Sequence, residues 1–428
     1  MRATYQITEY GSFVAEKALN GFVSIPQNTF DGLEDFILSN SSRNSEALDL
    51  MGLSVKKGIG KVITVKNYVG IITMKDGSTI EILPKIYSRV PQNEKMVKHL
   101  LVDMLRSLHN SPCKSIQTTK VGIERMNIFE IFIRMFIDEV YSIVKHGLKS
   151  DYERVAENSA VFKGKLVVSQ HIRNNYAHKE RTYIAFDEYN VNRAENRLIK
   201  STLLYLYRKT TTSKNKTDLR NLLNAFDEVK PSTSYEEDFS RISPDRNMAD
   251  YATALIWCNV FLLGKSFTSF SGSQVAFALL FPMELLFESY IAKQLYKLVD
   301  KRKMLFFAQD RTYHLFDYPA KRFLMKPDIV VRQKEDGRTF IFDTKWKVLS
   351  DLKFNYGLSQ ADMYQMYAYH KKYDAASVSL IYPLCEGFSE RNTTQFTSKD
   401  GVTVRIRFVD LFDVNSSLLT IISNLTAD

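Results

Sequence analysis

Residues 326–346, KPDIVVRQKEDGRTFIFDTKW, contain two runs of β-branched and aromatic side chains, separated by a polar segment that includes Asp336-Gly337. Such runs are typical of β-strands, and Asp-Gly is a strong signal for a hairpin turn. The sequence therefore predicts an antiparallel hairpin with strands that begin near Asp328 and Thr339. The midpoint between positions 328 and 343 falls inside the turn, so the two aspartates are expected to lie nearly opposite each other. The turn type is not fixed by the sequence, which leaves room for a slip of one or two residues.

The predicted hairpin brings two acids and one base to one face. Side chains alternate along a strand, so Asp343 and Lys345 point to the same side. Mg²⁺ takes carboxylate oxygens and usually keeps several waters, so Asp328 and Asp343 could share one such ion, with Mn²⁺ as a substitute. A metal-bound water is a nucleophile suited to phosphodiester hydrolysis. Lys345 could orient that water, lower its pKa or stabilise negative charge, and the sequence does not choose among these roles.

The alternative is a solvated strand face on which an aspartate and a lysine form only a weak ion pair. The helix predicted before the hairpin, residues 281–295, favours the metal site. There, Glu288 shares a face with Leu285, Ile291 and Leu295. A carboxylate on an apolar stripe is expensive to bury unless it is paired or bound to a metal. Glu288 is therefore either a further carboxylate of the site or a helix-edge residue that reaches solvent.

A second helix is predicted after the hairpin, over residues 359–373. Gln365 lies on its polar stripe and could hold the lysine, a water or a phosphate, or could be an ordinary surface glutamine. The side chains expected to pack against the sheet are Met363, Met366, Tyr367 and Ala368. Further strands are predicted at 378–383 and 402–409.

The order of these elements resembles the PD-(D/E)xK nuclease superfamily. It runs from a helix with Glu, through a strand with Pro-Asp and a strand with Asp-x-Lys, to a helix with Gln and a further strand. The resemblance implies a restriction-endonuclease-like fold, with a mixed central sheet flanked by helices. The family pattern falls on Glu288, Asp328, Asp343, Lys345 and Gln365, which are the implied catalytic residues. The implied metal ligands are Asp328, Asp343 and Glu288. The second acid is Asp where many members have Glu, a mild departure.

Other patches resemble the McrC family, and they occur in family order from about residue 60 to residue 385. They are Asn67–Gly70, Thr79–Ile86, Phe162–Leu166, Ile172–Asn175, Phe186–Tyr189 and Asn196–Lys200. McrC proteins are the nuclease subunits of McrBC-type modification-dependent restriction systems. The resemblance implies double-stranded DNA as the substrate and an McrB-like AAA+ GTPase as the partner, in a possible higher-order complex with a hexameric ring. The chain is somewhat long for the family, with the surplus expected at the N-terminus and in 208–250.

Composition limits the remaining classes of function. The 428 residues carry a net charge of +10, which permits a polyanionic partner. The three cysteines are far apart and the seven histidines form no metal-spacing motif, which argues against a disulfide scaffold and a zinc enzyme. The N-terminus lacks the apolar core of a signal peptide, and no stretch is long enough to span a bilayer, so a cytoplasmic protein with no membrane partner is expected. No GxxxxGK[ST] loop occurs, so another chain is expected to hydrolyse any nucleotide.

The overall fold class expected is α+β or α/β, in three regions. Residues 1–90 are predicted to be a β-rich, partner-docking region, 91–270 a mainly helical middle region, and 271–428 the endonuclease domain. Strands are expected at 4–8, 20–24, 61–65, 68–74 and 79–83, and helices within 27–50, at 93–109, at 123–145 and over 192–229. The last helical stretch is expected to be interrupted by an exposed loop at 209–216, and 231–244 is expected to be a connection. A buried helix is expected at 251–264 and a loop at 265–274.

The sequence leaves three points open. The basic segment 152–197 could face phosphate, face a partner or be merely solvated. The chain could be a stand-alone PD-(D/E)xK nuclease of DNA repair or transposition. It could also be a mainly non-catalytic activator that docks on an AAA+ ring through its N-terminal region, including 60–86.

Overall fold

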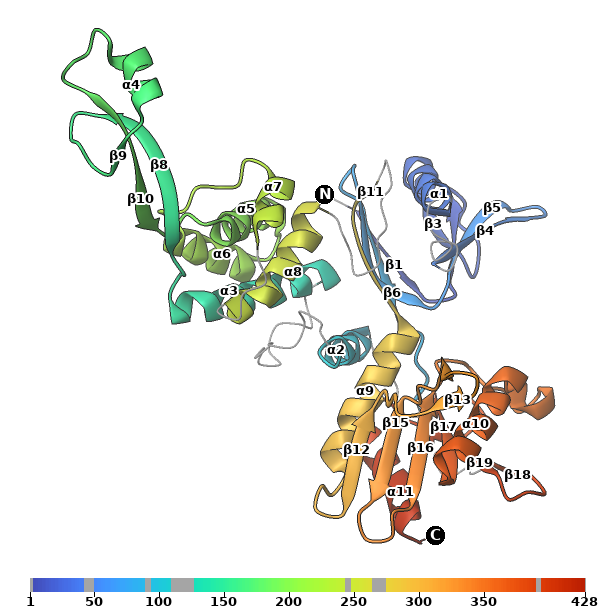
Figure 1. Cartoon of the computed structure of the whole chain (residues 1–428). Helices are drawn as coiled ribbons and strands as arrows, with labels where there is room; N and C mark the ends of the chain where they lie inside the picture. The colour runs from blue at the N-terminus through green and yellow to red at the C-terminus, as the bar shows by residue number, and fades with distance from the viewer. Residues whose placement is uncertain are drawn as a thin grey trace. The chain divides into compact units, whose positions relative to one another are not determined.

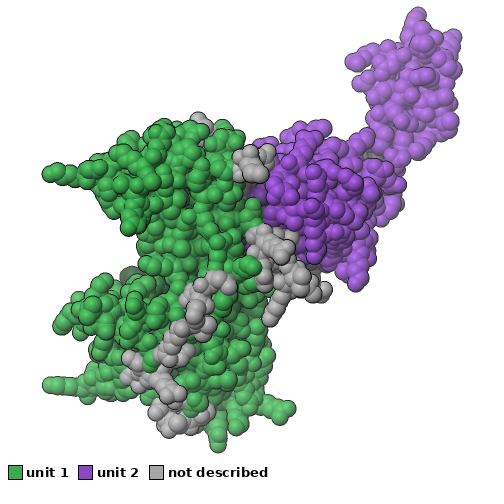
Figure 2. Space-filling view, turned by 180° about the vertical axis from the view of Figure 1, so that it is seen from behind, with its two compact units in different colours: residues 1–114, 119–128, 267–428 green, residues 115–118, 129–266 purple. Residues whose placement is uncertain are grey.

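The computed structural model describes residues 3–41, 50–88, 94–108, 127–242, 248–263, 275–389 and 394–427 (Figure 1). The chain forms two compact units (Figure 2). Unit 1 contains residues 1–114, 119–128 and 267–428, and unit 2 contains residues 115–118 and 129–266. Both ends of the chain therefore belong to unit 1. Within the described ranges, no helix is long and apolar enough to cross a membrane.

The first part of unit 1 consists of two four-stranded sheets, with strand orders β1-β7-β6-β11 and β3-β2-β5-β4. Their apolar faces share one core with the helix α1, to which Phe13, Phe36, Ile63 and Ile72 contribute. The elements are β1 (Thr4–Thr8), β2 (Ser12–Ala15), β3 (Val23–Ile25), α1 (Gln27–Ser41), β4 (Met51–Lys56), β5 (Gly60–Val65), β6 (Tyr68–Met74), β7 (Thr79–Leu83) and β11 (Val275–Pro282).

Strand β11 links the N-terminal sheet to the later part of the chain. It pairs antiparallel with β6, although more than 200 residues separate the two strands in sequence. β11 ends at Pro282, and α9 (Met283–Leu298) begins at the next residue. The helix that carries Glu288 is therefore continuous with a strand of the N-terminal sheet.

The second part of unit 1 is built on a six-stranded sheet with the order β12-β15-β16-β17-β19-β18. β16, β17 and β19 are parallel, and the other neighbours are antiparallel. All six residues of β16 are buried, as expected for a central strand covered on both faces. The strands are β12 (Met304–Ala308), β15 (Ile329–Gln333), β16 (Thr339–Thr344), β17 (Ala375–Pro383), β18 (Thr394–Thr397) and β19 (Thr403–Val409), with a separate hairpin of β13 (His314–Phe316) and β14 (Arg322–Leu324).

Helices cover both faces of this sheet. The crossover from β16 to the parallel strand β17 runs through α10 (Gln360–Tyr373), whose Met366 packs with Ile341 and Leu380. The opposite face is covered by α9, whose Phe287 contacts Trp346 with ring centroids 5.4 Å apart. The helix α11 (Val414–Ala427) contacts α9 and β19, and α2 (Glu94–Leu105) contacts α9 and β7. A short 3₁₀ turn, Phe354–Gly357, precedes α10.

Unit 2 combines a helical body with a projecting arm (Figure 1). Aromatic side chains fill the body, where Trp257 stacks on Phe261 at 5.4 Å between centroids. The body helices are α3 (Ile128–His146), α5 (Ala194–Lys209), α6 (Ser213–Ala225), α7 (Tyr235–Arg241) and α8 (Ala249–Leu263). The arm, residues 151–190, is a nine-residue antiparallel ladder of β8 (Asp151–Ser159) and β10 (Thr182–Asn190), with β9 (Lys165–Leu166) and α4 (Val168–Asn175) toward its tip.

The expected class, a mixed α and β fold with mixed sheets, is confirmed. The predicted strands at 4–8, 68–74 and 79–83 coincide with β1, β6 and β7. The helix expected at 251–264 is α8, and the one expected at 359–373 is α10. The division into regions 1–90, 91–270 and 271–428 stays a prediction.

Several local expectations were wrong. Residues 213–216 of the predicted loop form the first turn of α6, and the predicted connection 231–244 contains α7. The loop is held because Thr210, Thr211 and Asn215 donate hydrogen bonds to the buried Glu130 carboxylate. Tyr367, expected to pack against the sheet, is 42% exposed. The loop predicted at 265–274 lies outside the described residues.

Candidate active site

Asp328 and Asp343 are brought together by the β15–β16 hairpin. Ile329 pairs with Phe342 in the antiparallel ladder, so the same register, continued by one residue, sets Asp328 opposite Asp343. This is the register that the sequence predicted, without a slip. Opposed residues of an antiparallel pair have Cβ atoms roughly 4.5–5.5 Å apart. The two carboxylates therefore belong to one site, at the end of the central strand.

Lys345 completes the cluster from the same face as Asp343. Its Nζ lies 2.5 Å from Asp343 Oδ2, in an ion pair whose acid side chain is 1% exposed and whose lysine is 21% exposed. Lys345 Nζ also lies 3.4 Å from Oε1 of Gln365, which donates from Nε2 to the Tyr369 hydroxyl at 2.8 Å. Of the roles that the sequence left open for Gln365, the structure places it against the lysine.

Thr344 fixes the orientation of Asp328. Both its backbone N–H and its hydroxyl donate to Asp328 Oδ2, each at 2.7 Å. A carboxylate with one oxygen held in this way has its other oxygen left for a further ligand. Sequence reasoning missed Thr344, because a threonine between Asp343 and Lys345 is also an ordinary strand residue.

Glu288 approaches the cluster from α9 and is half-buried. Its Oε1 accepts a hydrogen bond from Nε2 of Gln309 at 2.6 Å, and the backbone N–H of Gln309 donates to the Asp328 carbonyl at 2.7 Å. Gln309 therefore joins the helical acid to the hairpin acid. It follows β12 directly, and nothing in the sequence pattern marks it as part of a site.

The acids interact electrostatically. Burial, together with the charge of Asp328, raises the pKa of Asp343 to about 7. Burial and Asp328 also raise the pKa of Glu288, against the opposing effect of the Gln309 hydrogen bond. Burial raises the pKa of Asp328 as well, although its bonds from Thr344 act in the other direction. Burial disfavours the charged form of Lys345, but the ion pair with Asp343 prevails and the lysine pKa is raised.

This donor set fits a hard divalent cation. A cation shared by buried carboxylates that raise one another's pKa would stabilise their ionised forms. Across the described part of the chain, no three His, Cys, Asp or Glu side chains are grouped closely enough to form a ready-made metal centre. Mg²⁺ is commonly bound through one or two carboxylates plus waters, so Asp328 and Asp343 are sufficient as its protein ligands. Glu288 does not complete a three-ligand group in this structure.

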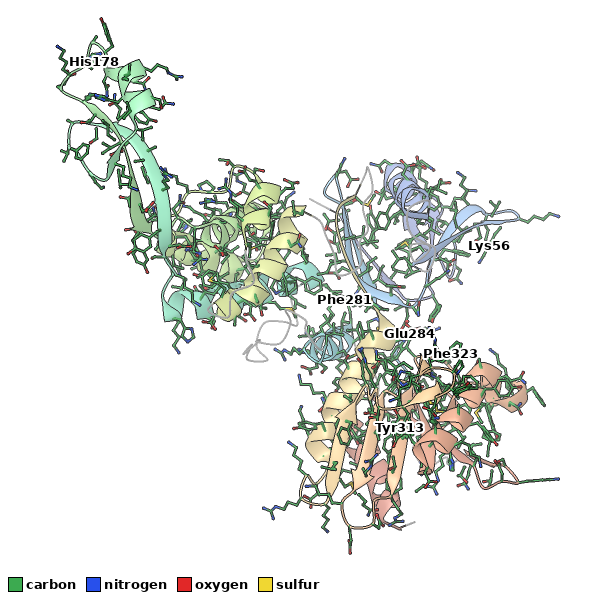
Figure 3. All side chains as sticks on the ribbon, viewed as in Figure 1. Lys56, His178, Phe281, Glu284, Tyr313 and Phe323 are labelled. Atoms are coloured by element: carbon green, nitrogen blue, oxygen red, sulfur yellow. The ribbon has the colours of Figure 1, made fainter. Side chains whose placement is uncertain are left out.

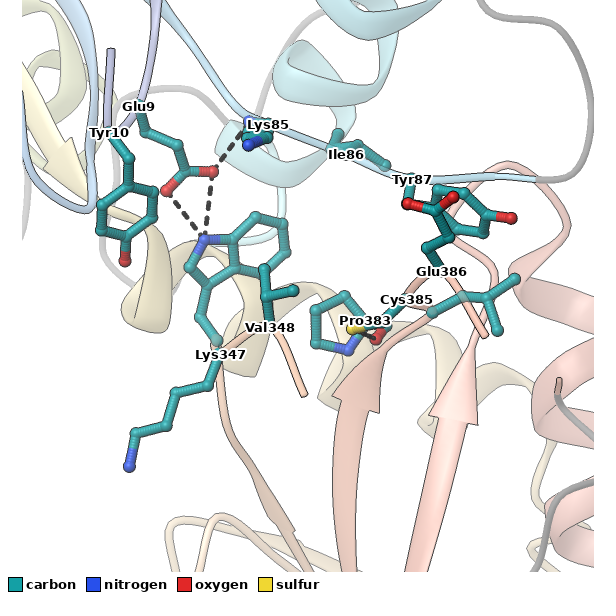
Figure 4. Close-up of a pocket in the computed structure, with 12 residues that line it drawn as sticks. Glu9, Tyr10, Lys85, Ile86, Tyr87, Lys347, Val348, Pro383, Cys385 and Glu386 are labelled. Carbon is teal, nitrogen blue, oxygen red and sulfur yellow. Dashed lines mark hydrogen bonds between the residues drawn. The ribbon is translucent and has the colours of Figure 1, made fainter. Parts of the chain in front are cut away.

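A cavity of about 510 Å³ is lined by Trp346 and Lys347, the two residues directly after Lys345 in the sequence (Figure 4). Its wall includes Trp346, whose indole nitrogen donates to the Glu9 carboxylate, and Lys85, whose backbone N–H donates to the same carboxylate. Glu9 follows β1, so the first strand of the chain is attached to the residue directly after Lys345. Pro383, the last residue of β17, and Cys385 also line the cavity.

The McrBC 5-methylcytosine restriction system component family matches residues 63–383 of this sequence. The chain belongs to that family. The resemblance inferred from Asn67–Gly70 and the patches after it is thereby confirmed. No curated protein shows a significant match to the chain.

Solved structures of McrBC assemblies match this family member, and the TM-score of the first shows a shared fold. One is a chain of the refined half-complex from a tetradecameric assembly of Thermococcus gammatolerans McrB AAA+ hexamers with bound McrC. It has a TM-score of 0.67 and 18% sequence identity, and the match covers 99% of this chain and 100% of that one. A second, from the Thermococcus gammatolerans McrBC complex, has a TM-score of 0.48 and 19% identity, and covers 70% of this chain and 90% of that one.

Proposed function

We propose that this McrBC family member is the DNA endonuclease subunit of its restriction system, with a PD-(D/E)xK site that hydrolyses phosphodiester bonds of double-stranded DNA with Mg²⁺. The observation that carries the proposal is the convergence of Asp328, Asp343 and Lys345 at the end of β16. Family membership supports a role in restriction. The position of the site between α9 and α10 supports Glu288 and Gln365 as its accessory residues.

Asp328 and Asp343 would hold Mg²⁺, or Mn²⁺ in its place. The Glu288 carboxylate would interact electrostatically with the same ion. When bound, the ion would supply an activated water and offset charge on the phosphate. Thr344 keeps Asp328 oriented through two hydrogen bonds. Lys345 is held by Asp343 and Gln365. Because the ion pair favours the charged ammonium, Lys345 is suited to donate a hydrogen bond and to stabilise negative charge in the transition state.

Substitutions in the candidate site, compared with substitutions in a control ion pair, test the proposed catalytic residues. Asp343→Asn and Lys345→Met should each abolish cleavage of plasmid DNA by the chain assayed with its partner, GTP and Mg²⁺, while DNA binding and thermal stability are kept. The matched control is the exposed pair Lys371–Asp400 of the same domain, whose atoms lie 2.7 Å apart. Asp400→Asn and Lys371→Met should cut at the wild-type rate. Wild-type cleavage by Asp343→Asn would overturn the assignment.

We also propose that the chain acts with an AAA+ GTPase partner, as the assemblies with McrB hexamers suggest. The segment 60–86 stays a possible docking region, but it offers little apolar surface, because Ile63, Ile72 and Ile82 are fully buried. The arm of unit 2 is the better candidate. Its exposed apolar side chains are Tyr152, Val161, Phe162, Leu166, Val168, Ile172, Tyr176 and Tyr189. Contiguous exposed apolar residues with a polar surround are typical of protein interaction sites.

Two measurements test the partnership. GTP turnover by the partner should rise in the presence of the full chain, and the double variant Ile172→Ala/Tyr176→Ala should reduce this stimulation. Removal of residues 1–190 should abolish it, because the arm lies within that segment. Unchanged stimulation by both variants would reject docking through the arm. Robust plasmid cleavage with Mg²⁺ and no partner would favour a stand-alone nuclease instead.

A further inference from the structure

The hairpin β13–β14 is exposed on both of its faces. Every residue from Leu315 to Leu324 is exposed, and the pairing of His314 with Leu324 and of Phe316 with Arg322 defines the ladder. Its large apolar side chains are open to solvent, at 54% for Phe316, 90% for Tyr318 and 73% for Phe323. A two-stranded hairpin is at best marginally stable alone in water, so one with this composition is suited to a binding partner.

The aromatic side chains of the hairpin form an ordered edge rather than scattered contacts. The rings of Phe316 and Phe323 meet edge to face, with centroids 5.9 Å apart. Phe323 has a φ of +57°, a left-handed conformation that is unusual for a bulky residue. Tyr313, directly before β13 (Figure 3), packs against Tyr373 of α10 with ring centroids 4.6 Å apart, which anchors the hairpin to the domain.

The segments before and after the hairpin lead directly to residues of the candidate active site. On one side, Gln309 contacts both the Glu288 side chain and the Asp328 carbonyl. On the other side, five residues of chain lead from Phe323 to Asp328. Five residues span at most about 18 Å, and a base pair of B-DNA rises about 3.4 Å. Phe323 therefore lies within about five base pairs of a phosphate that a metal ion on Asp328 would hold.

The charge on this segment suits a polyanion. Arg311, Lys321, Arg322 and Lys326 are exposed cations along 310–326. The two acids of the segment are already engaged: Asp310 accepts a hydrogen bond from Tyr373, and Asp317 pairs with Lys372 at 2.5 Å. Apolar side chains flanked by basic ones, on a narrow protruding element, are the features of proteins that wedge side chains between base steps.

We propose that the β13–β14 hairpin is a DNA wedge: its aromatic edge, Phe316, Tyr318 and Phe323, enters a groove of duplex DNA beside the phosphate to be cut, while Lys321 and Arg322 contact the flanking phosphates. The proposal rests on the proposed nuclease function, because the wedge sets the position of the phosphate relative to Asp328 and Asp343. Deforming the duplex costs free energy that depends on its sequence, so the wedge would favour easily unstacked base steps without a base-specific contact.

Binding and base unstacking test the wedge independently of cleavage. The full chain in EDTA is titrated onto a fluorescein-labelled duplex, and permanganate oxidation reports unstacked thymines. Phe316→Ala/Phe323→Ala should weaken binding at least about ten-fold and abolish the permanganate signal that the wild type produces. The control, Tyr296→Ala/Leu419→Ala on α9 and α11, removes exposed apolar side chains outside the hairpin and should change neither.

The basic pair gives a second readout. Lys321→Ala/Arg322→Ala should lower the slope of log affinity against log salt by about 1.8, since each lost phosphate contact removes about 0.9. Lys301→Ala/Arg302→Ala, an exposed Lys-Arg pair before β12, should leave the slope unchanged.

Each outcome decides for or against the wedge. Wild-type binding and unstacking by Phe316→Ala/Phe323→Ala would overturn it, even if the wild-type chain cuts DNA. Loss of affinity with no permanganate signal in the wild type would also overturn it, since the hairpin would then touch only the backbone. The wedge would also be overturned if Phe316→Ala/Phe323→Ala lost association with a protein partner while its DNA affinity was unchanged. Unstacking by a wild-type chain that never cuts, even with the partner, GTP and Mg²⁺ present, would support the wedge and reject the nuclease.

Discussion

The Glu9 carboxylate accepts a hydrogen bond from the Trp346 indole, with Nε1 2.9 Å from Oε2 and 3.2 Å from Oε1. The two residues are 337 positions apart in the sequence. Trp346 directly follows Lys345, so the bond connects the start of the chain to the end of the strand that carries the candidate catalytic residues. Glu9 is 1% exposed, and its charge state therefore bears on the stability of this junction within unit 1.

Glu9→Gln should change the pH dependence of stability. Burial raises the pKa of Glu9 from 4.5 to about 7, although hydrogen bonds from Trp346 and Lys85 oppose the rise. The folded protein then holds the proton more tightly than the unfolded chain, so this contribution is full below pH 4.5 and is lost as the pH rises to about 7. In the wild type, Glu9 makes the free energy of unfolding fall as the pH rises from about 5 to about 8. In the variant this fall should be smaller by on the order of 3 kcal/mol.

Urea unfolding at the two pH values measures this difference. Glu386 is an exposed acid that lines the same cavity, and Glu386→Gln should keep the wild-type pH dependence. A Glu9→Gln variant with the wild-type pH dependence would show that ionising Glu9 costs no more free energy in the folded protein than in the unfolded chain.

Trp346→Phe should destabilise the protein more at high pH than at low pH. The substitution removes the indole donor but keeps a ring against Phe287. A buried acceptor that loses its donor costs about 1–3 kcal/mol, and more when the acceptor is charged. Because Glu9 is increasingly ionised above about pH 7, the loss should be larger there, as measured by urea unfolding. Equal losses at both pH values would contradict the role assigned to the bond.

The local signals in the sequence predict much of the site. Asp336-Gly337 and the spacing between 328 and 343 gave the hairpin register, because turn chemistry and strand alternation act over few residues. Thr344 and Gln309 escaped prediction because their roles depend on hydrogen bonds rather than on residue type. The contact between Glu9 and Trp346 depends on tertiary packing across nearly the whole chain.

The fold shows the same limit. β6 and β7 could be predicted from their apolar and β-branched residues and from Asp76-Gly77 between them, whereas the pairing of β11 with β6 joins segments with no local relation. The arm strand β8, DYERVAENS, was not predicted because it lacks an apolar face. Its partner β10 supplies the backbone hydrogen bonds that stabilise it, and that pairing is invisible in either segment alone.

Thr344→Val should slow cleavage while leaving the fold intact. Valine has nearly the same shape, and the backbone N–H to Asp328 would remain, but the hydroxyl bond at 2.7 Å would be lost. Loss of one hydrogen bond to a charged group is worth about 1.5–3 kcal/mol, so a decrease of roughly 10- to 100-fold in cleavage rate is expected. Raising the Mg²⁺ concentration should recover part of the rate, since the effect acts through Asp328. A wild-type rate at low Mg²⁺ would show that the hydroxyl does not orient the acid.

Gln365→Leu should reduce cleavage less than Lys345→Met does. Gln365 acts through the lysine, which would still be paired with Asp343. The expected decrease is about ten-fold, corresponding to one hydrogen bond of about 1–1.5 kcal/mol, with DNA affinity unchanged. Tyr369→Phe, which removes the hydroxyl that accepts from Gln365 Nε2, should show a smaller effect in the same direction. A loss in Gln365→Leu as large as that in Lys345→Met would instead place Gln365 in contact with the substrate.

Gly70→Ala should unfold or severely destabilise unit 1. Gly70 has a φ of +136°, and a Cβ there would lie 2.0 Å from the Leu279 carbonyl oxygen of β11. The clash would separate β6 from β11 or force both strands to shift, at a cost of more than about 3 kcal/mol. Gly60→Ala is the matched control, because Gly60 has a φ of +102° but no heavy atom within 4 Å of the methyl group that alanine would add, so only backbone strain of about 1 kcal/mol is expected. Urea unfolding of both variants compares them, and equal stabilities would show that β6 and β11 do not approach so closely at Gly70.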